Sequence, residues 1–186
     1  WRDDDVDKSQ QAESYLYLMR GARVLYEATL DESYLIFAID LANKARVIFY
    51  DEENGGFFDG EERKDLVIRL KDDFDSATPT PSSVGRLEYA ILAEITGQTE
   101  FREVAEKSLK AVVPILTESP TALAESLKAV EFFVSKPARA VIVGGTSTEE
   151  FLKVAWGGLR RNLLIIGTKG PVAEFTAALT EKEKGK

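Results

Sequence analysis

The chain has 186 residues and a formal net charge of −8. An acidic chain without a basic stripe repels the phosphates of nucleic acids and of anionic lipids, so neither is an expected partner. There is no cysteine and no histidine, which excludes disulfides, thiolate catalysis, cysteine–zinc sites and the commonest general base within this sequence. These features are compatible with a cytoplasmic protein, and we expect that location.

No apolar run approaches the about 20 residues that a membrane-spanning helix requires. The sequence begins with Trp1 rather than with a start methionine or a signal peptide, so we expect the chain to be a portion of a longer protein.

The first two elements are predicted helices over 9–29 and 32–49. Asp31 lies between them and is a good N-cap, and the short connection predicts an antiparallel hairpin. The first helix has apolar residues at a spacing of three and four: Ala12, Tyr15, Leu16, Met19, Ala22 and Tyr26.

A small β-hairpin is predicted near 57–70. The run Asn54-Gly55-Gly56 is a strong turn signal, and short apolar stretches follow at 57–59 and 66–70. Three more helices are then predicted over 82–96, 100–115 and 119–134. Pro81 suits the first turn of one helix, Thr80 or Ser82 suits its cap, and Pro114 kinks or ends the next.

The two helical hairpins resemble one another at an offset of 67 residues, which predicts a repeat and therefore a solenoid or a toroid. The alternative is chance, because leucine and alanine are common on helices. The paired positions are Leu25/Leu92, Glu27/Glu94, Thr29/Thr96, Tyr34/Phe101 and Ala38/Ala105, and the last two pairs are expected in the core.

The texture of the sequence changes after residue 136. Strands are predicted from Ala138 and from Asn162 with a helix over 148–156 between them, which is the pattern of a parallel βαβ unit, and a further short helix over 172–179. The expected organisation is a helical-hairpin portion over 1–136, containing the small β-hairpin, with a βαβ-containing unit over 137–186 packed on it.

The long polar segment over 69–85 is the first candidate site, because loops on a rigid scaffold commonly carry function. Its carboxylates can accept bonds from sugar hydroxyls, they can supply oxygen ligands to a hard cation, or they can form a charged turn that caps the next helix. We expect no metal site. The candidate ligand-binding residues are Arg69, Lys71, Asp73, Asp75, Thr78 and Ser83, with Asp72 in the same charged cluster.

The turn before that loop is a candidate cleft rim, formed by Asp51, Gly55, Gly56 and Phe58, although a left-handed glycine turn is the favoured interpretation. Asp75 is expected to have a structural role first, by accepting a backbone N–H bond from Ala77 or Thr78. The run Gly144-Gly145-Thr146, between a strand and a helix, is a weak hint of an anion site or an ordinary turn.

A family resemblance rests on the order of several of these motifs. The residues that carry it are Asp51-Glu-Glu-Asn-Gly-Gly-Phe-Phe-Asp, Arg69-x-Lys71, Asp75-x-Ala77-Thr78-Pro79 with Ser83 and Val84, then Ser119-Pro120 and Ala140-Val-Ile-Val-Gly144. In this order the chain resembles the thioredoxin-domain-containing YyaL-like proteins.

The resemblance implies an N-terminal thioredoxin-like domain followed by an (α/α) toroid similar to the N-acylglucosamine 2-epimerases and the six-hairpin glycosidases, with this chain as a C-terminal portion. Ser76 departs from the family's glycine, and Thr80-Pro81-Ser82 from its Ser-Gly-Asn. There is no Cys-x-x-Cys, and nothing matches the catalytic histidines of the epimerases, so neither activity carries over.

Two functions remain open at this point. The first is a non-catalytic helical scaffold in a larger protein, partnered by the thioredoxin-like domain and needing no cofactor. The second is a carbohydrate-binding or carbohydrate-processing toroid portion with the 69–83 loop at its cleft, which takes a sugar or another polar small molecule. An incomplete toroid exposes apolar helix faces, so self-association is also expected.

Overall fold

The computed structural model describes residues 8–143, 148–158 and 162–168, and within these ranges the chain is mainly helical with one small parallel sheet. The predicted helix over 172–179 and the Gly144–Thr146 turn lie outside the described residues. No helix in the described part is both long and apolar enough to cross a membrane. The elements are α1 (Ala12–Thr29), α2 (Glu32–Phe49), α3 (Pro81–Thr96), α4 (Thr99–Ala111), α5 (Val113–Glu118), the short 3-10 helix η1 (Pro120–Leu123), α6 (Ala124–Val134), β1 (Ala138–Val143), α7 (Thr148–Trp156) and β2 (Leu163–Thr168).

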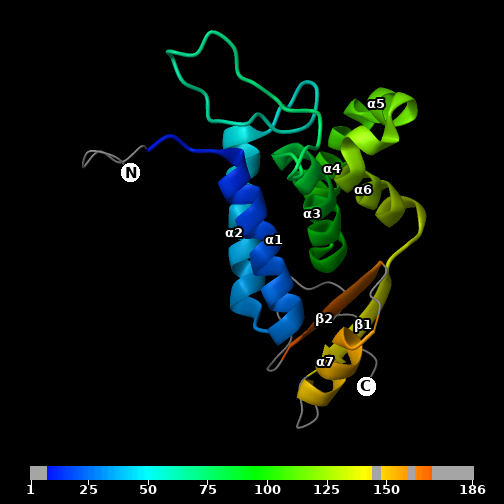
Figure 1. Cartoon of the computed structure of the whole chain (residues 1–186). Helices are drawn as coiled ribbons and strands as arrows, with labels where there is room; N and C mark the ends of the chain where they lie inside the picture. The colour runs from blue at the N-terminus through cyan, green and yellow to red at the C-terminus, as the bar shows by residue number, and fades with distance from the viewer. Residues whose placement is uncertain (1–7, 144–147, 159–161, 169–186) are drawn as a thin grey trace.

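Helices α1 and α2 pack side by side and form the first hairpin (Figure 1). The side chain of Asp31 accepts a bond from the Ser33 N–H at 2.9 Å, which confirms the predicted N-cap of α2. Helix α1 begins three residues later than predicted, because Gln11 is extended and pairs with Gly60 as an isolated antiparallel bridge.

Helices α3 and α4 form the second hairpin. Pro81 occupies the first turn of α3, the Thr80 hydroxyl accepts the Ser83 N–H at 3.1 Å, and Gly97 ends the helix with φ at +72°. Helix α4 ends before Val112, earlier than predicted, and Pro114 lies in the first turn of the separate helix α5. Proline has no N–H for a continuing helix ladder but suits a new first turn.

The ends of α1 and α3 have the same local structure. Thr29 donates its hydroxyl to the Leu25 carbonyl and Thr96 donates to the Leu92 carbonyl, both at 2.7 Å. Each threonine oxygen also accepts the N–H two residues further on, at 3.2 Å. The 67-residue offset therefore describes two equivalent hairpins and not only a similarity of composition.

Helix α3 lies at the centre of the helical array, between α1, α4 and α6 (Figure 1). Almost all of its side chains are buried, whereas α1 and α2 bury one side each. The predicted fifth helix begins as η1, and α6 continues it beside α3. One apolar core extends through α1, α2, α3, α4 and α6 to β2.

The C-terminal strands form the predicted parallel pair, in register from Ala138 opposite Leu163 to Val143 opposite Thr168. The Tyr26 hydroxyl of α1 donates to the Gly167 carbonyl at 2.9 Å and accepts the Gly167 N–H at 3.1 Å. Burial raises the pKa of Tyr26 to about 12, with the Gly167 bond opposing that shift, so this hydroxyl stays neutral. The buried side chain of Tyr26 thus joins the sheet to the first hairpin.

The predicted β-hairpin near 57–70 is wrong. Phe57 pairs with Tyr50 in an isolated bridge, and only the Asp59 N–H reaches across to the Leu70 carbonyl, at 2.9 Å. The apolar side chains of the second predicted strand are exposed, namely Leu66, Val67, Ile68 and Leu70. This strand therefore has no apolar surface on which to pack. An isolated two-stranded hairpin is marginal without such a surface, and the segment instead forms a long loop.

Candidate functional site

The candidate site begins with the turn that follows α2. Gly55 and Gly56 have φ values of +76° and +80°, as the glycine-turn interpretation requires. One carboxylate oxygen of Asp51 accepts the N–H groups of Glu53 and Asn54, at 3.0 and 2.9 Å. Asp51, Gly55 and Gly56 are buried, so these three residues lie inside the packed loop and not at an open edge.

Lys71 closes this turn from the other side. Its ammonium lies 2.6 Å from an Asp51 carboxylate oxygen and 2.8 Å from the Gly55 carbonyl, and it lies 4.9 Å from the centre of the Phe58 ring. Burial alone would raise the pKa of Asp51, but the bonds from Lys71 and from the turn N–H groups hold it well below its usual value. The cation and the carboxylate therefore neutralise one another.

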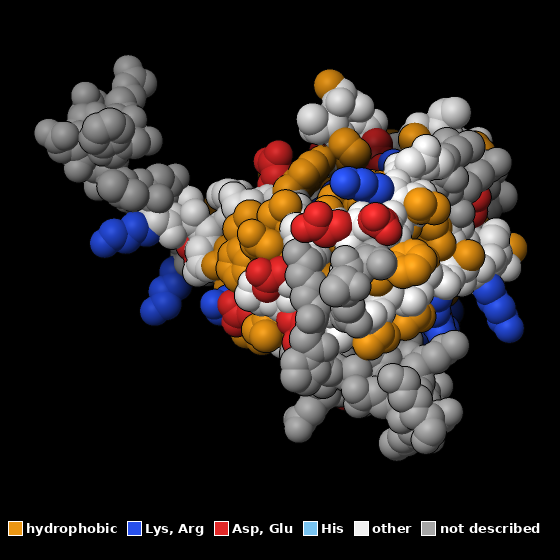
Figure 2. Space-filling model, turned by 90° about the horizontal axis from the view of Figure 1, so that it is seen from below, with side chains coloured by type: hydrophobic (Ala, Val, Ile, Leu, Met, Phe, Trp, Pro, Cys, Tyr) orange, Lys and Arg blue, Asp and Glu red, His pale blue; other side chains and the backbone are white. Residues whose placement is uncertain are grey.

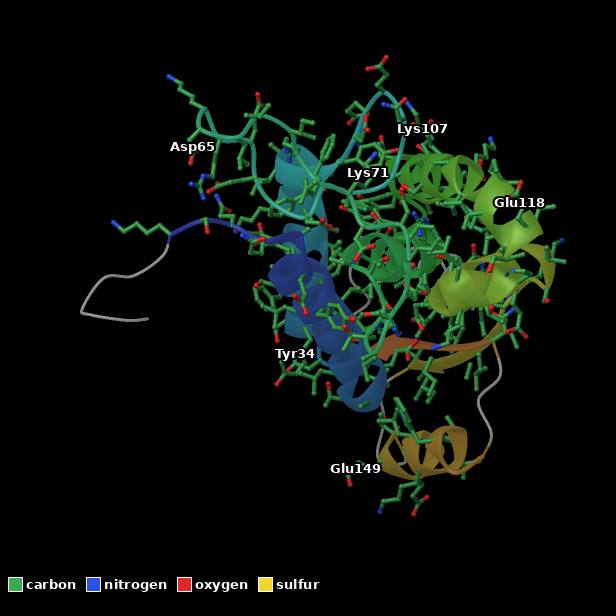
Figure 3. All side chains as sticks on the ribbon, turned by 45° about the horizontal axis from the view of Figure 1, so that its top comes forward. Tyr34, Asp65, Lys71, Lys107, Glu118 and Glu149 are labelled. Carbon is green, nitrogen blue, oxygen red and sulfur yellow. The ribbon has the colours of Figure 1, made fainter. Side chains whose placement is uncertain are left out.

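Lys107 of α4 donates to the Glu52 carbonyl of the same turn. Figure 3 shows Lys71 and Lys107 on the same side of the molecule, at the end where the long loop lies. A Cβ at Gly55 would lie 2.8 Å from the Lys107 carbonyl oxygen, so the turn and α4 are in direct contact. The turn is therefore clamped by two lysines from different segments.

Arg69 holds the loop to the end of α2. Its guanidinium donates to the carbonyls of Ile48 and Gly60, at 2.8 and 2.9 Å, and lies 4.1 Å from the centre of the Phe58 ring. All of these contacts are made with other groups of the same chain. Arg69 and Lys71 thus flank one aromatic ring and connect separate parts of the loop.

Asp75 joins the starts of two helices. Its carboxylate accepts the Thr80 N–H at 2.8 Å and the Glu125 N–H at 2.9 Å, and its own N–H donates to the Ala122 carbonyl at 2.8 Å. The structural role was predicted, but the predicted donors were wrong, because the bonds go to residues five and fifty positions away. Negative charge is favourable at a helix N-terminus, so Asp75 stabilises both α3 and α6 there.

Ser83 lies in a buried polar cluster around Arg86. The Ser83 hydroxyl is 3.0 Å from that of Ser126, and one Arg86 nitrogen donates to both, at 3.2 and 2.9 Å. Arg86 also donates to the Ser108 carbonyl at 3.0 Å and lies 3.6 Å from the Asp73 carboxylate. Burial lowers the pKa of Arg86 to about 10, and the Asp73 charge opposes this, so Arg86 remains cationic at neutral pH.

A second ion network, which sequence analysis missed, connects α1, α3 and α6. Glu88 of α3 is fully buried and accepts from Arg20 of α1 at 2.9 Å and from Arg23 of α1 at 2.5 Å. Arg20 also contacts Glu125 of α6 at 2.5 Å. Burial raises the pKa of Glu88, but the two guanidinium groups outweigh it and hold that pKa below its usual value. A charged residue inside an otherwise apolar helical pattern was the only signal in the sequence.

Two of the predicted ligand residues line small hollows beside this loop. Arg69 lines one of about 230 Å³, and Thr78 lines another of about 220 Å³ at the N-terminal ends of α1 and α3. Burial raises the pKa of Asp59 there, and the charges of Asp72 and Asp73 add to this shift. In the described part of the chain, no group of three acidic side chains is placed to hold a metal ion.

Two larger hollows lie away from the loop. One of about 630 Å³ is bounded by α1, α3, α6 and β2, and one of about 600 Å³ lies between α4, α6 and the start of β1. Neither contains a predicted site residue. The predicted residues therefore share a loop, but the structure does not gather them around one cavity.

Comparison with solved structures identifies the class of fold. The chain resembles the crystal structure of a family 76 glycoside hydrolase from a bovine Bacteroides thetaiotaomicron strain, with a TM-score of 0.52 and 14% sequence identity. The match covers 83% of this chain and 35% of that one. This likeness concerns the fold: an array of helical hairpins of the kind found in that glycosidase.

Comparison of sequences identifies the relatives. The chain is 31% identical over 140 residues to spermatogenesis-associated protein 20 of Rattus norvegicus and 29% identical to that of Homo sapiens. It is 26% identical over 138 residues to an uncharacterised protein of Caenorhabditis elegans. These matches cover 74% of this chain but only 18% to 19% of the relatives' length. No family model matches the sequence.

Proposed function

We propose that this chain is a non-catalytic helical scaffold portion of a larger, thioredoxin-domain-containing protein. One observation carries the proposal: the polar residues of the long loop are bonded to the chain itself. Arg69 and Asp75 bind backbone groups, Lys71 pairs with Asp51, and Ser83 belongs to a buried cluster. Polar groups satisfied in this way stabilise a fold and leave little bonding capacity for a ligand.

The relatives' lengths support the second half of the proposal, since the match covers 18% of the rat protein. The thioredoxin-like domain itself is what the YyaL-like resemblance implies. In that arrangement the helical hairpins form a rigid frame, and the long loop fixes the ends of α2, α3 and α6 relative to one another.

The proposal is tested by titrating the protein with neutral mono- and disaccharides and following its amide spectrum by NMR. The scaffold role predicts no saturable shifts at millimolar sugar. Saturable shifts confined to residues 69–83 would contradict it.

Carbohydrate binding is the second candidate, and the glycosidase-like fold favours it. The hollow of about 220 Å³ beside Thr78 is where the loop presents hydroxyl and carboxylate groups together. If this candidate holds, Thr78→Val and Asp72→Ala abolish sugar-dependent shifts while the melting temperature stays unchanged. Ser14→Ala, on an exposed face of α1, is the matched control.

A further inference from the structure

The two equivalent hairpins differ in what they expose. In the second hairpin Leu92, Phe101 and Val104 are 0%, 1% and 2% exposed. Their partners at the 67-residue offset in the first hairpin are also apolar, but Leu25, Tyr34 and Phe37 are 45%, 36% and 42% exposed. The expectation that Tyr34 is a core residue is therefore wrong for the described chain, whereas Ala38 and Ala105 are both buried.

The way in which the hairpins pack explains this difference. Arg20 and Arg23 of α1 meet Glu88 of α3, so this face of α1 lies against the side of α3 that carries Glu88. Glu88 and Leu92 are separated by one helical turn and share that side of α3. At the 67-residue offset the corresponding side of α1 carries Gly21 and Leu25.

That side of α1 is open in the described structure. Leu18, Gly21 and Leu25 follow one another at helical spacing, all three are exposed, and a Cβ built on Gly21 meets nothing within 4 Å. Figure 1 shows α1 and α2 at one edge of the helical array, and Figure 3 shows Tyr34 on the outer side of this hairpin. An apolar stripe of this kind, with its repeat equivalent buried, marks an interaction surface.

We propose that the open side of the α1–α2 hairpin binds another helical hairpin of the same repeat, supplied by the longer protein. The new hairpin lies on α1–α2 as α1–α2 lies on α3–α4. This inference rests on the proposed scaffold role, since both require a longer chain. Relatives in which the matched part is 18% of the length have room for such a hairpin.

The chemistry of the surface specifies the partner. Glycine at position 21 takes the place of the carboxylate that Glu88 contributes between the described hairpins, so this joint has no buried anion for a guanidinium to pair with. A glycine flanked by leucines instead permits close approach of a helix backbone. The partner is therefore an amphipathic hairpin that offers an apolar stripe and not the arginine pair seen on α1.

Burial of the surface is expected to change the effect of substitutions made there. The experiment measures melting temperatures of Leu25→Ser and Phe37→Ser in the 186-residue chain and in the complete product of its gene. In the 186-residue chain both side chains are exposed, and each change is expected to shift melting by less than about 2 °C. In the complete protein each is expected to lower it by about 5 °C or more.

Leu92→Ser is the matched control, because Leu92 is buried in both proteins and its substitution is expected to lower melting in both. Gly21→Ala is an independent test, because the direction of its effect on stability should differ between the two proteins. It is expected to stabilise the short chain, where it replaces a glycine on an exposed helix face, and not to stabilise the complete protein. Equal shifts in the two proteins for Leu25→Ser and Phe37→Ser would overturn the proposal. A complete protein that has no helical hairpin outside these 186 residues would overturn it as well. The sugar titration is unaffected by these variants, so failure here is distinguishable from failure of the scaffold role.

Discussion

Asp75 shows how one carboxylate can organise a loop of this length. Its carboxylate accepts the N–H of Thr80, at the start of α3, and the N–H of Glu125, at the start of α6. These two donors are 45 positions apart in the sequence. Two N–H groups at helix starts would lose their acceptor if this side chain were removed. The loop's conformation and the relative placement of the two helices therefore depend on the same group.

We predict that Asp75→Ala destabilises the protein by about 2–3 kcal/mol, since it removes two bonds to a charged acceptor. This corresponds to a fall in melting temperature of about 5–10 °C for a chain of this size. Asp75→Asn retains one carbonyl acceptor and should lie between the two. Asp65→Ala, which breaks only an exposed ion pair, is the control and should melt like the parent. Parent-like melting of Asp75→Ala would end the structural interpretation of this residue.

Asp51 predicts a specific dependence of stability on pH. Its pKa is lower in the folded protein than in the unfolded chain, so its contribution to stability is present above about pH 4 and is lost as the pH falls below that value. Urea unfolding between about pH 6 and pH 3 should show a shallower loss of stability for Asp51→Asn than for the parent. Lys71→Met should act in the same direction, because it removes the cation that lowers this pKa. Parallel pH profiles for parent and variants would contradict the assignment.

At this scale the predictable features were the local ones. Asp31 as a cap, Thr80 as a cap and the glycine turn at 55–56 follow from bonds between residues a few positions apart. The partners of Asp75 and Arg86 could not be predicted, since they lie on helices that only the folded chain brings together. The sequence therefore indicated which residues matter in the loop and that Asp75 has a structural role, but not the partners that these residues bind.

Among the elements, α3 is in close contact with the segment that carries Phe57. A Cβ at Gly85 would lie 2.7 Å from the Phe57 ring, which is itself buried and lies 5.3 Å from the Tyr89 ring, between centroids. Gly85 is thus the position on α3 against which the Phe57 ring packs.

We predict that Gly85→Ala destabilises the protein by about 1–3 kcal/mol through overpacking. Gly21→Ala in the 186-residue chain is the matched control, also in a helix interior but facing open space, and it should stabilise the protein by about 0.5–1 kcal/mol. Urea midpoints of the two variants measure the difference. Stabilisation by both would show that the Phe57 ring moves aside.

The network around Glu88 fixes how α1 and α3 meet. We predict that Glu88→Met destabilises the protein by about 3 kcal/mol, because buried Arg23 would keep only its 3.3 Å contact with Glu27. The double variant Arg23→Met with Glu88→Met should recover part of this loss, since Glu27 then loses its contact with Arg23. A double-mutant cycle of unfolding free energies tests the coupling. Additive effects would show that the pair does not act as a unit.

The helices were predictable because their apolar spacing is regular and their ends carry strong signals. The β-hairpin was predicted wrongly because branched apolar residues at 66–70 resemble a strand, yet no core lies beneath them. The missing information is tertiary: a strand requires a neighbour on which to pack, and the sequence of the segment does not contain that neighbour. The parallel pair β1–β2 was predictable because two apolar runs flank a helical segment, although only β2 is largely buried in the structure.

At the scale of the whole molecule, the open α1–α2 surface has a consequence for the isolated chain. Hydrophobic side chains also gather on the face seen from the sheet end of the molecule, with acidic and basic side chains among them (Figure 2). We predict that the 186-residue chain self-associates at high concentration and that Leu25→Asp with Phe37→Asp reduces this. Sedimentation velocity over a concentration series measures it, and a parent that remains monomeric throughout would contradict the prediction.

The central claim is that the long loop holds the ends of α2, α3 and α6 together and does not bind a ligand. One experiment tests this claim most directly. Parent and Asp75→Ala are compared in parallel by thermal melting and by NMR titration with neutral sugars. The scaffold account predicts that Asp75→Ala melts several degrees lower and that neither protein shows saturable shifts. A variant that melts like the parent, together with saturable shifts in the parent that the variant lacks, would contradict the account and identify the loop as a binding site.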